Sequence, residues 1–347
     1  MLRVRGFRNL ADADLELPGP GCVVIGPNGH GKTSLLEALL YPQVFRSFRG
    51  AADRDMVRFG ADGFHVEAQR DGGRRVAAGY DARTRHKRVT LDGAEPARLS
   101  EAIGVVRGVV LSPGDVALVS GGPRERRRYL DVLLSLTVRG YVEALSRYRR
   151  ALAHRARAEG SGMGAFEEVA AEHGARVIAE RRAWSERWAA AYAAHCRSIG
   201  EMQASRLAYQ PRTDGGTDEL RRALEAGRER DKALGRTGAG PHRDELRLTL
   251  DGRSLRAFGS AGQQRTAALA LRLIETEAMD ASGGALLCLD DAFAELDAER
   301  SSRLGALIEA RARSGSRIVA AVPKEADIPD VIASLPRWTF ETGRIAA

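Results

Sequence analysis

The chain has 347 residues, which is enough for about two or three structural units and a sizeable core. Charged residues make up 29% and aromatic residues 5%, and the formal net charge is +8. This composition excludes a disordered chain and favours a polyanionic partner over a neutral one. Because no long apolar N-terminal region or membrane-length apolar run is present, we expect a cytoplasmic protein with no membrane partner.

Arginines make up all but four of the 54 basic residues, and the lysines are Lys32, Lys87, Lys232 and Lys324. Arginine suits bidentate phosphate contacts. A genome-wide coding bias explains the same ratio of arginine to lysine. The positive net charge is therefore the more informative feature about the partner.

The first part of the chain is typical of strands joined by tight turns. The apolar run "GCVVIG" (21–26) predicts a strand, and "TSLLEALL" (33–40) has helical spacing. Two further strands, 64–70 and 74–81, flank the hairpin signal Asp71-Gly72-Gly73. Residues 87–93 and 107–113 add two more strands, the second of them buried and ended by a proline.

The middle of the chain predicts long helices. From Arg124 to Leu152 apolar residues recur every three or four positions, which indicates one helix with a single apolar stripe. A Gly-rich break at 160–164 is followed by a second stripe from Phe166 to Ile199. We expect an antiparallel hairpin of roughly 35-residue helices, each about 50 Å long.

Histidines and cysteines do not indicate a metal site. His173 and His195 lie on the second apolar stripe, where a packed residue at the edge of the core is more common than a ligand. Cys22 and Cys288 lie in apolar runs, and Cys196 forms no C-x-x-C pair with either. These cysteines are typical of reduced core residues.

The last part returns to α/β character. Residues 245–255 form a hairpin signal around Asp251-Gly252, a helix follows from about Ser260 to Met279, and 285–291 and 316–322 are predicted buried strands. We therefore expect an α/β lobe assembled from 1–122 and 236–347, with a helical insertion at 123–235. Two independent domains are the alternative, but each end alone lacks half of the nucleotide chemistry.

The strand at 21–26 leads into a G-x-x-x-x-G-K-T motif and a helix, which is the context of a phosphate-binding loop. Its glycines let backbone N–H groups point at a phosphate, and the helix adds its positive N-terminus. Lys32 would reach the β- and γ-phosphates, and the Thr33 hydroxyl would bind Mg²⁺. The predicted ATP-binding residues are Gly26, Pro27, Asn28, Gly29, His30, Gly31, Lys32, Thr33 and Ser34.

Two further stretches complete the nucleotide chemistry. In "ALLCLDD" Asp290 ends a buried strand and would hold Mg²⁺, while Asp291 would polarise the attacking water or serve only as a capping or loop carboxylate. In "FGSAGQQ" Ser260 is a good helix N-cap and Gly262 permits close backbone approach. Alone, this second stretch could be only a helix cap.

The combination of these motifs resembles the ABC-type ATPase heads of the SMC/Rad50 class, a P-loop α/β fold here carrying an inserted helical hairpin. The resemblance implies that Ser260, Gly262, Gln263 and Gln264 form a signature motif that acts on the nucleotide of a second subunit. It also implies a D-loop role for Glu295 and Asp297, and catalytic roles for Lys32 and Asp291.

Motifs spread over the whole chain narrow the resemblance to the RecF family: "GHGKTSLLEAL", "FRSFR", "PGDVALVSGGPRERRRYLD", "GPHRDEL" and "LDDAFAELD". This implies a DNA-dependent ATPase that forms homodimers with ATP and Mg²⁺ and binds DNA at single-strand gaps. It also implies that the protein acts with RecR and RecO to load RecA in DNA repair, replication and the SOS response. Slow ATP hydrolysis would then release the protein. His30 departs from the family's usual glutamine, and Pro323 follows the strand at 316–322 where transporter ATPases have a histidine.

DNA contacts are predicted in the basic runs of the chain. The candidates are Arg126, Arg127, Arg147, Arg150 and Arg157, although a solvated helix face explains any single run as well. Two other classes remain open. The ATPase subunit of an ABC transporter shares the motifs but would need a coupling glutamine and a switch histidine. A small-molecule P-loop kinase would leave Ser260–Gln264 and the helical hairpin without a role.

Overall fold

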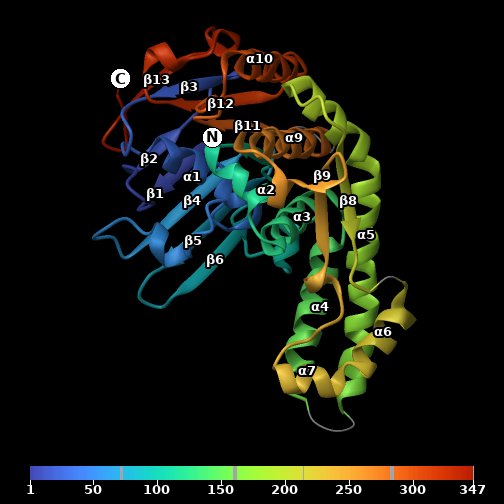
Figure 1. Ribbon diagram of the computed structural model, residues 1–347. Coiled ribbons are helices and arrows are strands. Elements are labelled where there is room, and N and C mark those ends of the chain that lie inside the picture. The colour runs from blue at the N-terminus through green and yellow to red at the C-terminus, as the bar shows by residue number, and fades with distance from the viewer. Residues whose placement is uncertain (71–72, 159–161, 214, 282–284, 347) are drawn as a thin grey trace. The chain divides into compact units, whose positions relative to one another are not determined.

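The computed structural model of the protein describes residues 1–70, 73–158, 162–213, 215–281 and 285–346 (Figure 1). It contains two compact units, one formed by Met1–Asp115 with Leu271–Ala347 and the other by Val116–Ala270. The first unit is thus assembled from both ends of the chain. Its limits differ from the lobe of 1–122 and 236–347 expected from the sequence, because residues 116–122 and 236–270 cluster with the middle of the chain.

The first unit is built on a mostly parallel sheet with the strand order β14-β13-β3-β12-β11-β7. Its strands are β3 (Gly21–Ile25), β7 (Gly108–Leu111), β11 (Leu286–Asp290), β12 (Arg317–Val322), β13 (Arg337–Glu341) and β14 (Arg344–Ala346). Only β14 runs antiparallel, against β13. The central strands are continuous apolar runs, as expected for strands covered on both faces. Their parallel register brings the ends of β3, β12 and β11 to one edge of the sheet.

Helix α1 (Lys32–Val44) packs against this sheet and against a second, antiparallel one. It is buried along most of its length, and its buried acid Glu37 is paired with Arg8 at 2.8 Å. The core around it contains Leu35, Leu36, Cys22 and Cys288. Both cysteines are fully buried, and burial raises the pKa of the Cys22 thiol to about 12, so each is a packed residue as the sequence predicts.

The antiparallel sheet has the order β2-β1-β4-β5-β6. Its strands are β1 (Leu2–Arg5), β2 (Ala13–Leu15), β4 (Gly63–Gln69), β5 (Arg75–Asp81) and β6 (His86–Leu91). The pairing of β4 with β5 confirms the strands predicted at 64–70 and 74–81. The turn signal between them, Asp71-Gly72, lies outside the described residues. A further helix of this unit, α10 (Ala298–Arg313), connects β11 to β12.

The second unit contains the helical arm. Its helices are α2 (Ala117–Ser120), α3 (Pro123–Thr137), α4 (Tyr141–Arg155), α5 (Met163–Ile199), α6 (Thr217–Ala226), α7 (Arg228–Leu234) and α8 (Leu255–Phe258). Helix α5 confirms the long second helix, and it lies beside α4 (Figure 1). The single first helix is wrong: Val138 is extended and Gly140 has a left-handed φ of 79°, which separates α3 from α4. The apolar spacing continues across this break and concealed it.

The arm carries an antiparallel sheet that the sequence analysis missed in part. Strands β9 (Glu245–Leu250) and β10 (Arg253–Ser254) form the hairpin predicted at 245–255. Strand β8 (Ser205–Gln210) pairs with β9 along its full length, although the sequence interpretation treated this region as helical insertion. Its residues alternate strictly between buried and exposed, which is the signal of a half-covered strand.

Buried ion pairs hold the arm together. Arg181 of α5 is 2% exposed and donates to Asp131 Oδ1 at 2.7 Å and to the Pro241 carbonyl at 2.7 Å. Tyr141 donates to the same carboxylate oxygen at 2.8 Å. Because the charge is both paired and hydrogen-bonded, removing one partner would leave an uncompensated buried charge. The network therefore fixes α3, α4 and α5 around one centre.

Helix α9 (Ala261–Asp280) begins in the second unit and ends in the first. It confirms the helix predicted from Ser260 to Met279. Among the described residues, no helix is long and apolar enough to cross a membrane.

Candidate nucleotide site

The predicted phosphate loop connects β3 to α1 at the edge where the parallel strands end. Gly31 caps α1 with a φ of 107°, and a Cβ there would lie 3.1 Å from the Phe340 ring. Only glycine fits both the left-handed backbone and the close neighbour. The loop therefore leads directly into the N-terminus of α1. There, unpaired N–H groups and the helix dipole favour the binding of an anion.

Lys32 is 7% exposed and its ammonium lies inside the loop. It donates to the carbonyls of Gly26 at 2.5 Å and Pro27 at 3.0 Å. Burial lowers the pKa of Lys32, while the nearby carboxylates of Asp291 and Asp290 raise it. A buried ammonium held only by neutral carbonyls is well placed to exchange them for a phosphate.

Thr33 and Asp290 come together as the sequence predicts, although 257 residues separate them. The Thr33 hydroxyl donates to Asp290 Oδ1 at 2.9 Å. Burial raises the pKa of Asp290, the Thr33 hydrogen bond lowers it, and the Asp291 carboxylate raises it again. A hydroxyl and a carboxylate oxygen in contact at the mouth of a phosphate loop suit Mg²⁺. The described residues contain no cluster of three or more His, Cys, Asp and Glu ligands, so a bound ion would take its other ligands from phosphate and water.

Asp291 follows β11 in a turn with a φ of 52°, and its N–H donates to the Ala321 carbonyl at 3.1 Å. Its carboxylate accepts no hydrogen bond from the described residues. Burial raises the pKa of Asp291, Lys32 lowers it and Asp327 raises it. The N-cap of the next helix, α10, is Asp297, which accepts from the Arg300 N–H at 2.8 Å. Asp291 therefore does not cap that helix, whereas Asp297 does; Glu295 is exposed in the loop between them.

The sequence did not indicate Asn9, whose side chain is hydrogen-bonded to the phosphate loop and to the first turn of α1. Its amide donates to the Gly29 carbonyl at 2.9 Å, and its carbonyl oxygen accepts from the Ser34 hydroxyl at 2.9 Å. Nearby, Gly343 N–H donates to the His30 carbonyl at 2.9 Å. These contacts join segments from both chain ends to the loop. No local sequence pattern predicts these contacts, because they form only in the tertiary structure.

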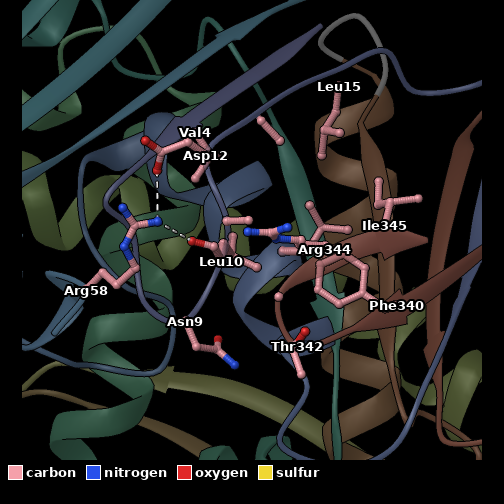
Figure 2. A pocket seen from close by; sticks show the side chains of 14 residues that line it. Val4, Asn9, Leu10, Asp12, Leu15, Arg58, Phe340, Thr342, Arg344 and Ile345 are labelled. Carbon is pink, nitrogen blue, oxygen red and sulfur yellow. Dashed lines mark hydrogen bonds and ion pairs between the residues drawn. The ribbon is translucent and has the colours of Figure 1, made fainter. Parts of the chain in front are cut away.

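A cavity of about 690 Å³ adjoins the loop through Asn9 and Thr342 (Figure 2). Side chains of the N-terminal segment, including Leu10 and Asp12, line it together with those of the β13–β14 hairpin, including Phe340. Arg58 also lines the cavity, and it donates to Asp12 at 2.9 Å and to the Leu10 carbonyl at 3.0 Å. The volume and mixed lining are typical of a small-molecule site.

The predicted signature residues form a capping box at the start of α9. Ser260 N–H donates to Gln263 Oε1 at 3.0 Å, and Gln263 N–H donates to Ser260 Oγ at 3.3 Å. Gln264 turns to α8, where its amide donates to the Leu255 carbonyl at 3.0 Å. Ser260 is exposed and Gly262 half-buried. The structure thus confirms that Ser260 caps the helix. Ser260 is nevertheless accessible from outside the chain.

The predicted DNA-contacting arginines separate into two kinds. Arg126 is 4% exposed, pairs with Glu245 at 2.8 Å and also donates to three main-chain carbonyls, so the prediction for this residue is wrong. Arg127 is half-buried and donates to the Asp244 carbonyl at 2.7 Å. By contrast, Arg147, Arg150 and Arg157 are exposed, and none has a side-chain partner within the described part of the chain.

The sheet, the phosphate loop entering α1 and the paired acids after β11 define an ATPase head of the ABC and SMC type. The AAA domain family matches residues 1–65. The SMC head domain of Pyrococcus furiosus has a TM-score of 0.55 at 16% identity, covering 98% of this chain and 92% of its own, which shows the shared fold.

The chain is 35% identical to the DNA replication and repair protein RecF of Chloroflexus aggregans, over all of this chain and 98% of that protein. It is 34% identical to the protein of the same name from Myxococcus xanthus, over 92% of this chain and 88% of that one. A solved structure described as the recombination mediator protein RecF-ATP in the RecFOR pathway has a TM-score of 0.89 at 25% identity, over 99% and 96% of the two chains. The chain belongs to the RecF family. This decides against the transporter subunit and the small-molecule kinase.

Proposed function

We propose that the protein is an ATP-gated, DNA-binding recombination mediator in which ATP joins two copies of the chain. The observation that carries this proposal is the meeting of Lys32, Thr33 and Asp290 at one edge of the sheet. The solved relative described with ATP supports the choice of nucleotide. The cavity beside Asn9 has room for the nucleoside.

Within one copy, each residue of the loop has a distinct task. Lys32 binds the β- and γ-phosphates, exchanging its carbonyl partners for phosphate oxygens. Thr33 and Asp290 would hold Mg²⁺, which neutralises charge on the phosphates when bound. Asp291 orients the attacking water, since its carboxylate has no other hydrogen-bond partner among the described residues. Slow hydrolysis then acts as a release step.

The second copy contributes the Ser260 turn. Ser260 is exposed at the start of a long helix, where its N-terminal N–H groups can bind an anion. We assign Ser260, Gly262, Gln263 and Gln264 to the terminal phosphate of the partner's ATP, and Glu295 and Asp297 to the loop that borders this contact. The dimer would thus form only around a triphosphate.

DNA would bind to the unpaired arginines of α4 and the residues after it, Arg147, Arg150 and Arg157. Phosphate contacts of this kind carry no sequence preference, which suits recognition of gapped DNA by shape. The solved relative named with the RecFOR pathway supports RecO and RecR as partners. We propose RecA loading as the outcome of their joint action.

Sizing by analytical ultracentrifugation tests the proposal. The wild type should be monomeric with ADP and dimeric with ATP, and Lys32→Met should stay monomeric because it loses ATP binding. Ser260→Arg should bind ATP as a monomer yet form no dimer. Dimers of Ser260→Arg with ATP would refute the role of the signature turn. In ATPase assays, Asp291→Asn should slow hydrolysis and prolong the dimer; an unchanged rate would make Asp291 a structural residue.

A further inference from the structure

The C-terminal hairpin of β13 and β14 runs alongside the phosphate loop. Strand β13 pairs in parallel with β3, and the pairing extends to Thr339 opposite Ile25, the last residue of β3. The next residue, Phe340, stays against the loop, because a Cβ on Gly26 would lie 2.2 Å from the Phe340 carbonyl oxygen. The hairpin therefore continues past the end of β3 and brings its turn to the loop residues that follow.

The turn of this hairpin consists of Thr342 and Gly343, whose φ values are 44° and 81° (Figure 2). Two successive positive φ values are typical of the two-residue turn whose twist matches that of antiparallel strands. Glycine adopts this conformation freely, but threonine is β-branched and is strained in it. A strained residue persists only where its surroundings hold it. Contacts outside the hairpin must therefore hold this turn.

His30 of the phosphate loop holds the turn with two hydrogen bonds. Its Nδ1 accepts from the Thr342 N–H at 3.3 Å, and its carbonyl accepts from the Gly343 N–H at 2.9 Å. A main-chain N–H can only donate, so Nδ1 is the unprotonated nitrogen of the imidazole ring. The Gly343 carbonyl accepts from the Ala11 N–H at 2.8 Å, and a Cβ on Gly343 would lie 2.0 Å from the Asn9 carbonyl oxygen. The turn is thus fixed between the loop and the N-terminal segment.

The position of His30 connects these contacts to nucleotide binding. Its neighbours Gly29 and Gly31 have φ values of 83° and 107°, and glycine loses more conformational freedom on ordering than any other residue. A contact that fixes the residue between two glycines reduces the freedom that the loop would lose when a ligand binds. A loop that already has its binding shape binds more tightly. Both contacts use acceptor atoms of His30, so they occupy no N–H group that a phosphate needs.

We propose that His30 is a positioning residue, which holds the phosphate loop against the Thr342–Gly343 turn and keeps it in the shape that binds ATP. The C-terminal hairpin thereby becomes part of the nucleotide site, although 312 residues separate His30 from Thr342. This inference rests on the proposed ATP binding. It predicts that loss of the Nδ1 acceptor weakens ATP binding, and that another acceptor at the same position restores it.

The test compares His30→Leu, which removes the acceptor at similar size, with His30→Asn, whose amide oxygen is attached to the same side-chain carbon as Nδ1. Affinity for a non-hydrolysable ATP analogue is measured by calorimetry with Mg²⁺. His30→Leu should weaken binding about five-fold, the effect of one hydrogen bond, and His30→Asn should bind within about two-fold of the wild type. His86→Leu removes an exposed histidine of β6 and should bind as the wild type does.

Gly343→Ala tests the same contact from the hairpin, because a Cβ there conflicts with the Asn9 carbonyl and with the φ of 81°. It should also weaken analogue binding. The double variant of His30→Leu and Gly343→Ala should lose less than the product of the two single losses, since both changes act on one contact. Without nucleotide, hydrogen exchange in residues 26–31 should be faster in each single variant than in the wild type.

Wild-type affinity in folded His30→Leu would overturn the inference while leaving the proposed ATP binding intact. Equal losses in His30→Leu and His30→Asn would also overturn it, because the acceptor would then not be responsible. Fully multiplicative losses in the double variant would show that the two residues act separately, which contradicts the inference. If the wild type binds neither the analogue nor ADP, the proposed ATP binding fails and this inference fails with it.

Discussion

The Thr33 hydroxyl donates a 2.9 Å hydrogen bond to Asp290, joining the first turn of α1 to the end of β11. The two residues are brought into contact because β3 and β11 both flank β12 in one parallel sheet. Their oxygens are the ones that Mg²⁺ would share with the phosphates.

Asp290→Asn should therefore raise the Mg²⁺ concentration needed for half-maximal ATPase activity by about ten-fold or more, since a neutral amide is a weaker ligand. The measurement is the hydrolysis rate over a Mg²⁺ titration at saturating ATP. Asp218→Asn, which changes an exposed acid of α6, is the matched control. An unchanged Mg²⁺ requirement in Asp290→Asn would remove the carboxylate from the proposed metal site.

Asn9→Ala should weaken ATP binding by about ten-fold or more. The side chain makes two hydrogen bonds to the loop, to the Gly29 carbonyl and the Ser34 hydroxyl, each contributing about 1 kcal/mol. Calorimetric titration with ATP checks this, with thermal unfolding as the control for folding. If Asn9→Ala binds ATP as the wild type does, the loop keeps its shape without this residue.

The joint replacement of Arg147, Arg150 and Arg157 by alanine should weaken DNA binding and flatten its salt dependence by about 0.9 per lost phosphate contact. The matched control replaces Arg221 and Arg222 of α6, which are exposed but paired with acids of their own helix. Affinity for gapped duplex is measured by fluorescence anisotropy over a range of salt concentrations. Equal salt slopes for both variants would place the DNA elsewhere.

Arg126→Ala should behave differently from these surface variants. It leaves Glu245 without its partner and three carbonyls without a donor, so we expect a loss of about 2 kcal/mol in the free energy of unfolding. Urea unfolding measures this loss. A stable variant with specifically reduced DNA affinity would restore Arg126 as a DNA contact.

Stability should depend on the protonation of His242. Its Nε2 lies 3.0 Å from the Thr237 carbonyl and must donate, so the neutral ring accepts from the Tyr148 hydroxyl at Nδ1. Burial lowers the pKa of His242 below its usual 6.5; the Thr237 hydrogen bond and Asp231 oppose this, and Arg243 and Arg127 add to it. The unfolded chain therefore binds the proton first, and stability is lost as pH falls below about 6.5.

Urea unfolding of the wild type and of His242→Gln between about pH 8 and pH 5 checks this sign. The wild type should lose more stability than the variant over the acidic half of the range. Parallel curves would show that His242 titrates alike in the folded and unfolded chains.

Local signals allowed the strand, loop and first helix of the site to be predicted from the sequence. The loop glycines, the apolar run before them and the acids at 290–291 each carry their own pattern. The break between α3 and α4 had no such signal, since the apolar spacing continues past Val138. Asn9 and Arg126 could not be assigned either, because their partners lie about 20 to 120 residues away and only folding brings them together.

The central claim is that one ATP is bound by Lys32 of one copy and by the Ser260 turn of the other. Mixing Lys32→Met with Ser260→Arg tests it most directly, because only a mixed dimer contains one site with both residues intact. Because neither variant is expected to dimerise with itself, each dimer in the mixture has one intact site of two, so the ATPase rate should recover from near zero to at most about half of the wild-type rate. A mixture as inactive as its two separate components, under conditions where the mixed dimer is seen by ultracentrifugation, would contradict a site shared between copies.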